Sequence, residues 1–205
     1  MPPKAKSGDR PAPLSLRERN KLRARQEMLD AALEVFAESG FGSATVENIA
    51  SRAGASKVTL YTYFPQGREG LFRELYEQIN NELLERASEI YAAEGGFADR
   101  VLALTEALLD VARRPLVGRF YSIDDPALDV ALNPVRGHAS RVWADLIAED
   151  LADAQARKTL TTAVPPRAVA ELLVGAMRSA LSEVARDHTQ AEGIVQAMNA
   201  LVRGL

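Results

Sequence analysis

The chain has 205 residues, of which 47% are hydrophobic and 26% are charged, enough for one or two globular domains with a buried core. It contains no cysteine, which excludes disulfides, thiolate metal sites and a cysteine nucleophile and is typical of a reducing, cytoplasmic location. We find no export signal and no run of roughly 18 apolar residues, so we expect a soluble protein without a membrane anchor.

Charge is distributed unevenly along the chain, although the net charge is only −3. Residues 1–68 hold eleven Lys or Arg against seven Asp or Glu, whereas residues 69–205 hold fourteen against twenty-one. This asymmetry favours an N-terminal part that binds a polyanion and an acidic remainder that does not. The alternative is a solvated, disordered basic tail, and charge alone does not separate the two.

The first predicted helix follows a flexible arm. Residues 1–14 are rich in proline and lysine and cannot bury apolar surface. Ser15 and Glu18 form a capping box, and apolar residues then recur at helical spacing over 16–38 until the sequence SGFG ends the run.

Two short helices come next. Thr45 caps a helix over 46–53, and Gly54 provides a residue that tolerates positive φ in the turn. Ser56 caps a third helix over 57–63. Two short helices joined by a tight glycine turn are typical of a helix-turn-helix unit.

The remainder of the chain is also predicted to be helical. Segment 115–134 contains three prolines and is expected to form loops and short helical pieces. Thr189 and Glu192 form a second capping box before the last helix. The helices expected here cover about 68–93, 97 to Arg114-Pro115, 135–156, 166–186 and 190–204. The sequence therefore predicts an all-α fold with about nine helices.

The third helix has an inward and an outward set of side chains. Leu60 and Phe64 are four residues apart and are expected to pack on Ile49 and the first helix. The helix start points its positive dipole end outward, which suits phosphate or a DNA groove. The side chains expected to face outward are Lys57, Val58, Thr59, Tyr61 and Tyr63.

Residues Leu29–Phe72 resemble the DNA-binding domain of the tetracycline-repressor (TetR) family of transcription regulators. The matching residues are Ala32, Phe36, Gly40-Phe41, Thr45, Ile49-Ala50, Ala53-Gly54, Ser56, Thr59-Leu60-Tyr61, Phe64 and Leu71. The resemblance covers about a quarter of the chain. Val58 stands where the family commonly has glycine, and Gly67 stands where it places a lysine, so we assign that lysine's phosphate contact to Arg68.

The resemblance implies an N-terminal arm over 1–14, a DNA-binding domain over 15–67 and a ligand-binding and dimerisation domain over 68–205. It implies DNA contacts from Thr45, Ser56, Lys57, Val58, Thr59, Tyr61, Tyr63 and Arg68. Lys4, Lys6, Arg10 and Arg17 are candidates for an arm that follows the DNA, with solvated charges as the alternative. Glu47 is interpreted as a partner of the second helix's dipole rather than a cytosine contact.

The larger domain is expected to dimerise and to enclose a small-molecule pocket. The residues expected at the dimer interface are Leu172, Leu173, Ala176, Ala180, Leu181, Met198 and Leu201. The residues expected at the pocket are Tyr91, Phe97, Leu104, Leu108, Phe120, Tyr121, His138, Trp143 and Met177. For both sets, plain burial in the chain's own core is the alternative.

The predicted function is a homodimeric repressor that binds a double-stranded, palindromic DNA operator and is released from it by an unidentified small molecule. Two alternatives are a regulator whose DNA binding is tightened by the ligand, and a helical adaptor. An all-α enzyme is a third, but the two histidines lie in different predicted helices and no HExxH, GxSxG or P-loop motif is present. We expect no catalytic residue, metal or cofactor.

Overall fold

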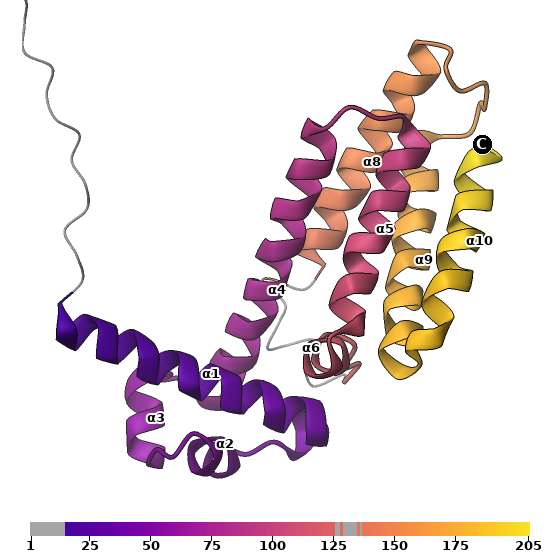
Figure 1. Cartoon of the computed structure of the whole chain (residues 1–205). Helices are drawn as coiled ribbons and strands as arrows, with labels where there is room; N and C mark the ends of the chain where they lie inside the picture. Colours follow the sequence, from indigo (N-terminus) through magenta and orange to yellow (C-terminus); the bar gives the residue numbers. More distant parts are fainter. Residues whose placement is uncertain (1–14, 126–127, 129–134, 136) are drawn as a thin grey trace, which may run out of the picture.

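The structure is a computed structural model that describes residues 15–125, 128, 135 and 137–205. These residues form nine α-helices and one short 3-10 helix, and they contain no strand (Figure 1). The predicted all-α fold is confirmed.

The helices fall into a small N-terminal group and a larger C-terminal group. The first group consists of α1 (Leu16–Ser43), α2 (Val46–Arg52) and α3 (Lys57–Tyr63). The second consists of α4 (Gly67–Ala92), α5 (Phe97–Arg113), α6 (Pro115–Tyr121), α8 (His138–Ala156), α9 (Pro166–Arg186), a 3-10 helix (His188–Gln190) and α10 (Ala191–Arg203). Most predicted bounds agree within a few residues.

Helix α1 is longer than expected because the chain resumes a helical turn after a break. The capping box forms as predicted, with the Glu18 backbone N–H donating to Ser15 Oγ at 3.3 Å and the Ser15 N–H donating to Glu18 Oε2 at 2.8 Å. Gly40 has φ 74° and ψ 175°, which interrupts the helix inside the predicted SGFG stop. A further turn then places Phe41 in the core.

The predicted capping box at Thr189 and Glu192 is wrong. Asp187 takes the capping role instead, because its carboxylate accepts hydrogen bonds from the Thr189 backbone N–H at 3.0 Å and from the Thr189 hydroxyl at 2.7 Å. A 3-10 turn therefore precedes α10, whose N-cap residue, Gln190, makes no side-chain capping bond.

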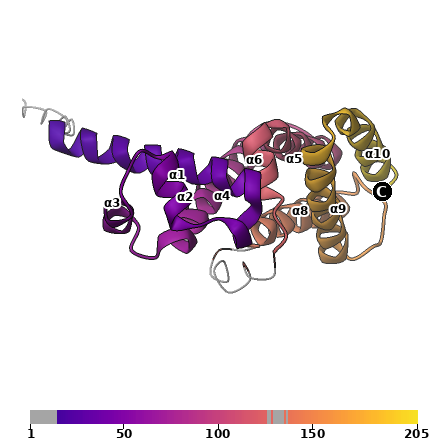
Figure 2. The same ribbon diagram turned by 90° about the horizontal axis from the view of Figure 1, so that it is seen from below.

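The two groups share one continuous hydrophobic core. Helix α4 begins beside α3 and runs into the larger bundle, where it packs against α5 and α8 (Figure 1). Helices α9 and α10 lie at the end of the molecule away from α3 (Figure 2). The short helix α6 contacts α1, α5 and α9, and so lies between the two groups.

Within the described part of the chain, no helix is long and apolar enough to cross a membrane. Helix α4 starts at Gly67, one residue before the expected boundary between the two domains, which we retain as a proposal.

Candidate nucleic-acid interface and ligand cavity

The turn between α2 and α3 is fixed by local hydrogen bonds, as the sequence predicts. Thr45 Oγ1 accepts from the Asn48 backbone N–H at 3.1 Å, and Ser56 Oγ accepts from the Thr59 N–H at 3.0 Å. Gly54 has φ 63°, in the left-handed region that favours glycine. Leu60 is fully buried, so the core sets the rotation of α3.

The outward face of α3 is accessible to a partner. Lys57, Val58 and Thr59 are all exposed, and Val58 has 77% of its surface accessible, which leaves a valine with no packing role within the chain. Lys57 forms an ion pair with Glu47 on α2. That pairing lowers the pKa of Glu47 and raises the pKa of Lys57, so both groups are charged at neutral pH.

Tyr61 and Tyr63 leave α3 on two different sides. Tyr61 is 41% exposed, and its ring edge lies 3.2 Å from the position that a Cβ atom on Gly67 would occupy. Gly67 also has φ 57°, so this turn requires glycine both for its backbone and for the approach of Tyr61. Tyr63 is half-buried beside the N-terminal part of α1.

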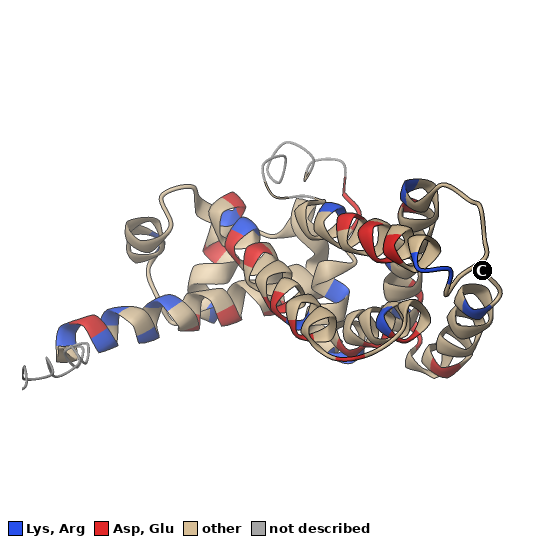
Figure 3. Cartoon of the chain, turned by 90° about the horizontal axis from the view of Figure 1, so that it is seen from above, with Lys and Arg blue, Asp and Glu red and all other residues tan. Residues whose placement is uncertain are grey.

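A shallow groove runs between α1 and α3. It is lined by Leu16, Arg17, Asn20, Lys21, Ala24, Thr62 and Tyr63. Lys and Arg residues gather on this N-terminal part of α1, which projects from the rest of the molecule (Figure 3). The predicted arm residues Lys4, Lys6 and Arg10 lie outside the described residues.

The structure places Arg68 away from the role that we predicted for it. Its Nη1 donates to the backbone oxygens of Ala44 at 3.0 Å, Phe41 at 3.2 Å and Gly42 at 3.3 Å. Its guanidinium also lies 4.6 Å from the centre of the Phe41 ring. Arg68 therefore satisfies the open carbonyl groups at the end of α1, which explains the residue without a phosphate.

Arg25 is a second linking residue, one that sequence reasoning missed. It forms a two-pronged ion pair with Glu74 on α4, and its guanidinium lies 4.7 Å from the centre of the Phe64 ring. These contacts join α1, the end of α3 and the start of α4. Arg25 lies among several other basic residues, and nothing in the sequence distinguished its structural role from that of a solvent-exposed charge.

The larger group contains a partly open cavity of about 350 Å³ between α4, α5, α6, α8 and α9. Five of the nine predicted pocket residues line it: Leu108, Phe120, Tyr121, Trp143 and Met177. The other four do not. Phe97 and Leu104 are buried in the core, Tyr91 lies beside Arg100, and His138 is at the exposed start of α8.

The cavity has aromatic walls and a small number of polar groups. Tyr121 donates its hydroxyl hydrogen to Asn80 Oδ1 at 2.5 Å and stacks on Tyr76 with ring centres 4.9 Å apart. Burial raises the pKa of Tyr121 well above its usual range, so the phenol stays protonated. Trp143 is 3% exposed, and its indole N–H has no hydrogen-bond partner among the described residues.

Several lining residues were not predicted. They are Phe72, Tyr76, Leu83, Ser122, Ile123, Ala139, Ser140, Val174, Gly175, Arg178, Ser179, Leu181 and Ser182. Phe72, Tyr76 and Leu83 lie on one face of α4, a spacing that indicates burial but does not distinguish a cavity wall from solid core.

Two walls of the cavity contact the N-terminal group of helices directly. The ring centres of Phe72 and Phe120 lie 4.5 Å apart. The ring centre of Phe36, in α1, lies 5.0 Å from that of Phe72 and 6.0 Å from that of Phe120. The ring centres of Phe41 and Phe72 lie 5.2 Å apart. These four residues form an aromatic cluster that joins the cavity to α1.

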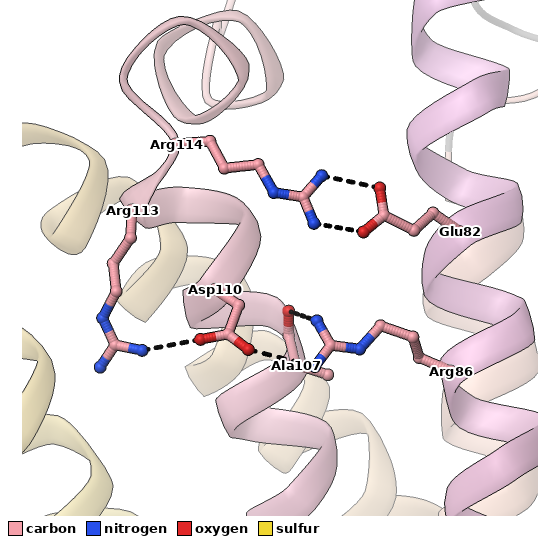
Figure 4. A network of polar contacts seen from close by, with 6 residues as sticks. All are labelled: Glu82, Arg86, Ala107, Asp110, Arg113 and Arg114. Atoms are coloured by element: carbon pink, nitrogen blue, oxygen red, sulfur yellow. Dashed lines mark hydrogen bonds and ion pairs between the residues drawn. The ribbon is translucent and has the colours of Figure 1, made fainter.

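Ion pairs hold α4 against α5 and α6 (Figure 4). Arg86 donates to Asp110 Oδ2 at 3.1 Å and to the backbone oxygen of Ala107 at 3.4 Å, while Arg114 donates to Glu82 Oε2 at 2.8 Å. The Arg114 guanidinium lowers the pKa of Glu82. These contacts link α4 to the α5–α6 corner.

The predicted dimer residues divide into two sets. Leu173, Ala180, Leu181 and Met198 are buried in the chain's own core, so they are unavailable to a partner and their assignment is corrected. Leu172, Ala176 and Leu201 are exposed, with 74% of Leu172 and 61% of Leu201 accessible. Helices α9 and α10 thus keep an apolar outer face.

The fold and the site together define a helix-turn-helix protein whose larger helical unit contains a cavity. Residues 28–75 match the sequence profile of the bacterial regulatory proteins of the tetR family. The matched segment contains α2 and α3, so the helix-turn-helix of this chain is similar to the DNA-binding domain of these transcriptional regulators.

Individual relatives agree with that assignment. The fatty acid metabolism regulator protein of Bacillus subtilis is 35% identical over 63 residues, which cover 31% of this chain and 32% of that protein, so the chain matches about a third of its length. An uncharacterized HTH-type transcriptional regulator of Mycobacterium tuberculosis is 26% identical over 73% of this chain and 76% of its own.

A solved structure supports the fold along most of the chain. The fatty acid degradation regulator FadR of Bacillus halodurans superposes with a TM-score of 0.71 at 17% identity, over 86% of this chain and 93% of its own.

Proposed function

We propose that this protein is a homodimeric, ligand-responsive repressor that a small molecule releases from a palindromic DNA operator. The observation that carries the proposal is the aromatic cluster, because Phe72 and Phe120 line the cavity while packing on Phe36 of the DNA-binding group. With DNA as its partner, the protein would act in the cytoplasm.

The exposed face of α3 is the proposed reading surface. Lys57, Val58 and Thr59 are assigned to base edges, and Val58 offers an apolar contact to a thymine methyl group. Lys57 must leave Glu47 to reach a base.

Phosphate contacts are proposed around this reading surface. Thr45, Tyr61 and Tyr63 flank α3 and offer hydroxyl groups, while Ser56 contributes by holding the start of the helix. Arg17 and Lys21 line the groove beside Tyr63 and are proposed to contact the backbone of the DNA. Arg68 is no longer assigned a DNA contact.

Dimerisation is proposed through the outer face of α9 and α10, which exposes Leu172, Ala176 and Leu201. A two-fold pair of these helices would form a four-helix bundle. Two copies of α3 could then read half-sites about 34–36 Å apart.

The mechanism follows from the walls of the cavity. A ligand that prefers one arrangement of Phe72 and Phe120 would shift α4 and α6 relative to α1, and with them the distance between the two α3 helices. Because such coupling is reciprocal, bound operator would lower the affinity for the ligand by the same factor.

Footprinting on DNA that flanks the protein's own gene tests the operator. A protected, two-fold symmetric site supports the proposal, and uniform, sequence-indifferent protection contradicts it. Adding ligand to that complex tests whether the ligand weakens operator binding. If the ligand tightens operator binding instead, the protein is co-repressed by the ligand and not released by it.

A further inference from the structure

We propose that the cavity takes a compact organic anion: an apolar body held between the aromatic walls, with an acidic group that Arg178 and the Trp143 indole N–H recognise. The inference rests on the proposed function in so far as this molecule is the effector. The chemical class of this molecule follows from the residues that line the cavity.

Trp143 provides the first observation. The residue is 3% exposed and lines the cavity, yet its indole Nε1–H has no partner among the described residues. Tryptophan has this one donor and no acceptor, and a buried donor without a partner costs free energy. A hydrogen-bond acceptor on the ligand would remove that cost, whereas a ligand with donors alone would not.

Arg178 provides the second observation. Among the described residues it has no ion pair and no hydrogen bond, although it lines the cavity. The other two arginines of α9 are both paired, Arg167 with Asp145 and Glu171 and Arg186 with Glu183. A single cation left without a carboxylate at a cavity is suited to a ligand that brings one.

Arg178 is an exposed residue of the lining whose charge acts on Tyr121 in the cavity wall. Burial is the main reason that the pKa of Tyr121 is raised, and the positive charge of Arg178 opposes that rise. The lining also contains an acidic residue, Asp124, but this carboxylate takes part in an interaction of its own. Arg178 is the one Lys or Arg among the described lining residues, and its charge favours an anion over a cation at this site.

The size and the walls limit the body of the ligand. A volume of about 350 Å³ lies at the lower end of the range of about 300–1,000 Å³ that small-molecule sites cover, which excludes enclosure of a complete dinucleotide-sized cofactor. Phe72, Tyr76, Phe120 and Tyr121 give flat apolar surfaces that suit a ring or a short alkyl chain.

Three probes with the same body separate the alternatives: phenylbutyrate, phenylbutanol and phenylbutylamine. Trp143 is the only tryptophan in the chain, so its fluorescence reports occupancy of the cavity in protein without DNA. We expect a saturable change with phenylbutyrate and binding at least about tenfold tighter than that of the alcohol, the gain expected of one charge-assisted hydrogen bond.

Variants test the two assigned groups. Arg178→Gln should weaken phenylbutyrate about tenfold and leave phenylbutanol unchanged, while Arg186→Gln, on the same helix but already paired, should change neither. Trp143→Phe keeps an aromatic wall and removes the donor, and calorimetry should show weaker binding of both acceptor-bearing probes.

The inference is overturned if the amine or the alcohol binds as tightly as the acid, if Arg178→Gln has no selective effect, or if phenylbutyrate gives no saturable change at millimolar concentration. Operator binding is measured separately. Loss of operator binding alone would defeat the proposed regulator and leave the anion site standing. Release of the operator by phenylbutanol and not by phenylbutyrate would defeat the anion site and leave the regulator.

Discussion

The centre of the Phe120 ring, at the wall of the cavity, lies 6.0 Å from the centre of the Phe36 ring in α1, so the cavity and the N-terminal helices are in direct packing contact. Phe36 itself is fully buried and is not part of the cavity lining. It can therefore be changed without altering any group that a ligand would touch.

We predict that Phe36→Leu reduces the coupling between ligand and DNA while leaving the two separate affinities close to those of the unchanged protein. Coupling in allosteric proteins is typically about 5–150-fold, and loss of the ring should bring it toward unity. Ligand titrations with and without operator measure it. Phe97→Leu is the control, because Phe97 is buried outside the aromatic cluster and should cost similar stability with coupling intact.

We predict that Gly67→Ala destabilises the protein by about 1–2 kcal/mol, because its φ of 57° disfavours any side chain. The new methyl group would also lie 3.2 Å from Tyr61 Cε1 and from Val46 Cγ2, so the Tyr61 ring must move and operator affinity should fall.

Gly193→Ala is the matched control for that change. This glycine lies inside α10, and a Cβ there meets nothing within 4 Å. It should therefore raise the free energy of unfolding by about 0.5–1 kcal/mol. Equal effects of the two substitutions in denaturant titrations would contradict the role of Gly67.

Arg68→Ala distinguishes the structural role of this residue from the phosphate contact that the sequence predicted. Loss of the hydrogen bonds to the end of α1 should lower the free energy of unfolding by about 2 kcal/mol. A phosphate contact would instead leave stability unchanged and reduce the salt dependence of DNA binding. Unfolding and DNA titrations on the same sample decide between them.

We predict that Leu172→Glu converts a dimer to a monomer, because it places a charge in the apolar outer face of α9. Since the side chain is exposed in the single chain, the fold should persist. Sedimentation at several concentrations measures the change. Val164→Glu, at an exposed apolar position outside α9 and α10, should leave the oligomeric state unaltered.

The features that sequence reasoning predicted correctly are those fixed by neighbours in the chain. Thr45, Gly54 and Ser56 cap helices or turn the backbone within three or four residues, so their signals are local. Thr189 shows where local reasoning fails, because the Asp187 carboxylate two residues earlier accepts both the Thr189 backbone N–H and its hydroxyl, which leaves neither group for a capping box with Glu192.

Contacts between segments that are far apart in the chain could not be predicted from such local signals. Arg68 bonds to carbonyl groups 24 to 27 residues earlier, and no periodicity indicates such a partner. Leu104 and Leu108 share one apolar stripe on α5, yet only Leu108 borders the cavity. Helical spacing predicts which side chains are buried, and the packing of whole helices decides whether they face another side chain or a void.

Whether α3 reads a specific DNA site is tested most directly by comparing the affinity for the footprinted operator with the affinity for random DNA over a range of salt concentrations. The double variant Lys57→Ala with Tyr61→Ala should lose at least about a hundredfold in operator affinity, as expected for a base contact and a phosphate contact together. Arg157→Ala, which removes an exposed cation remote from α3, should bind normally. If the unchanged protein binds both DNAs equally, or if the double variant still selects the operator, then α3 is not the reading helix.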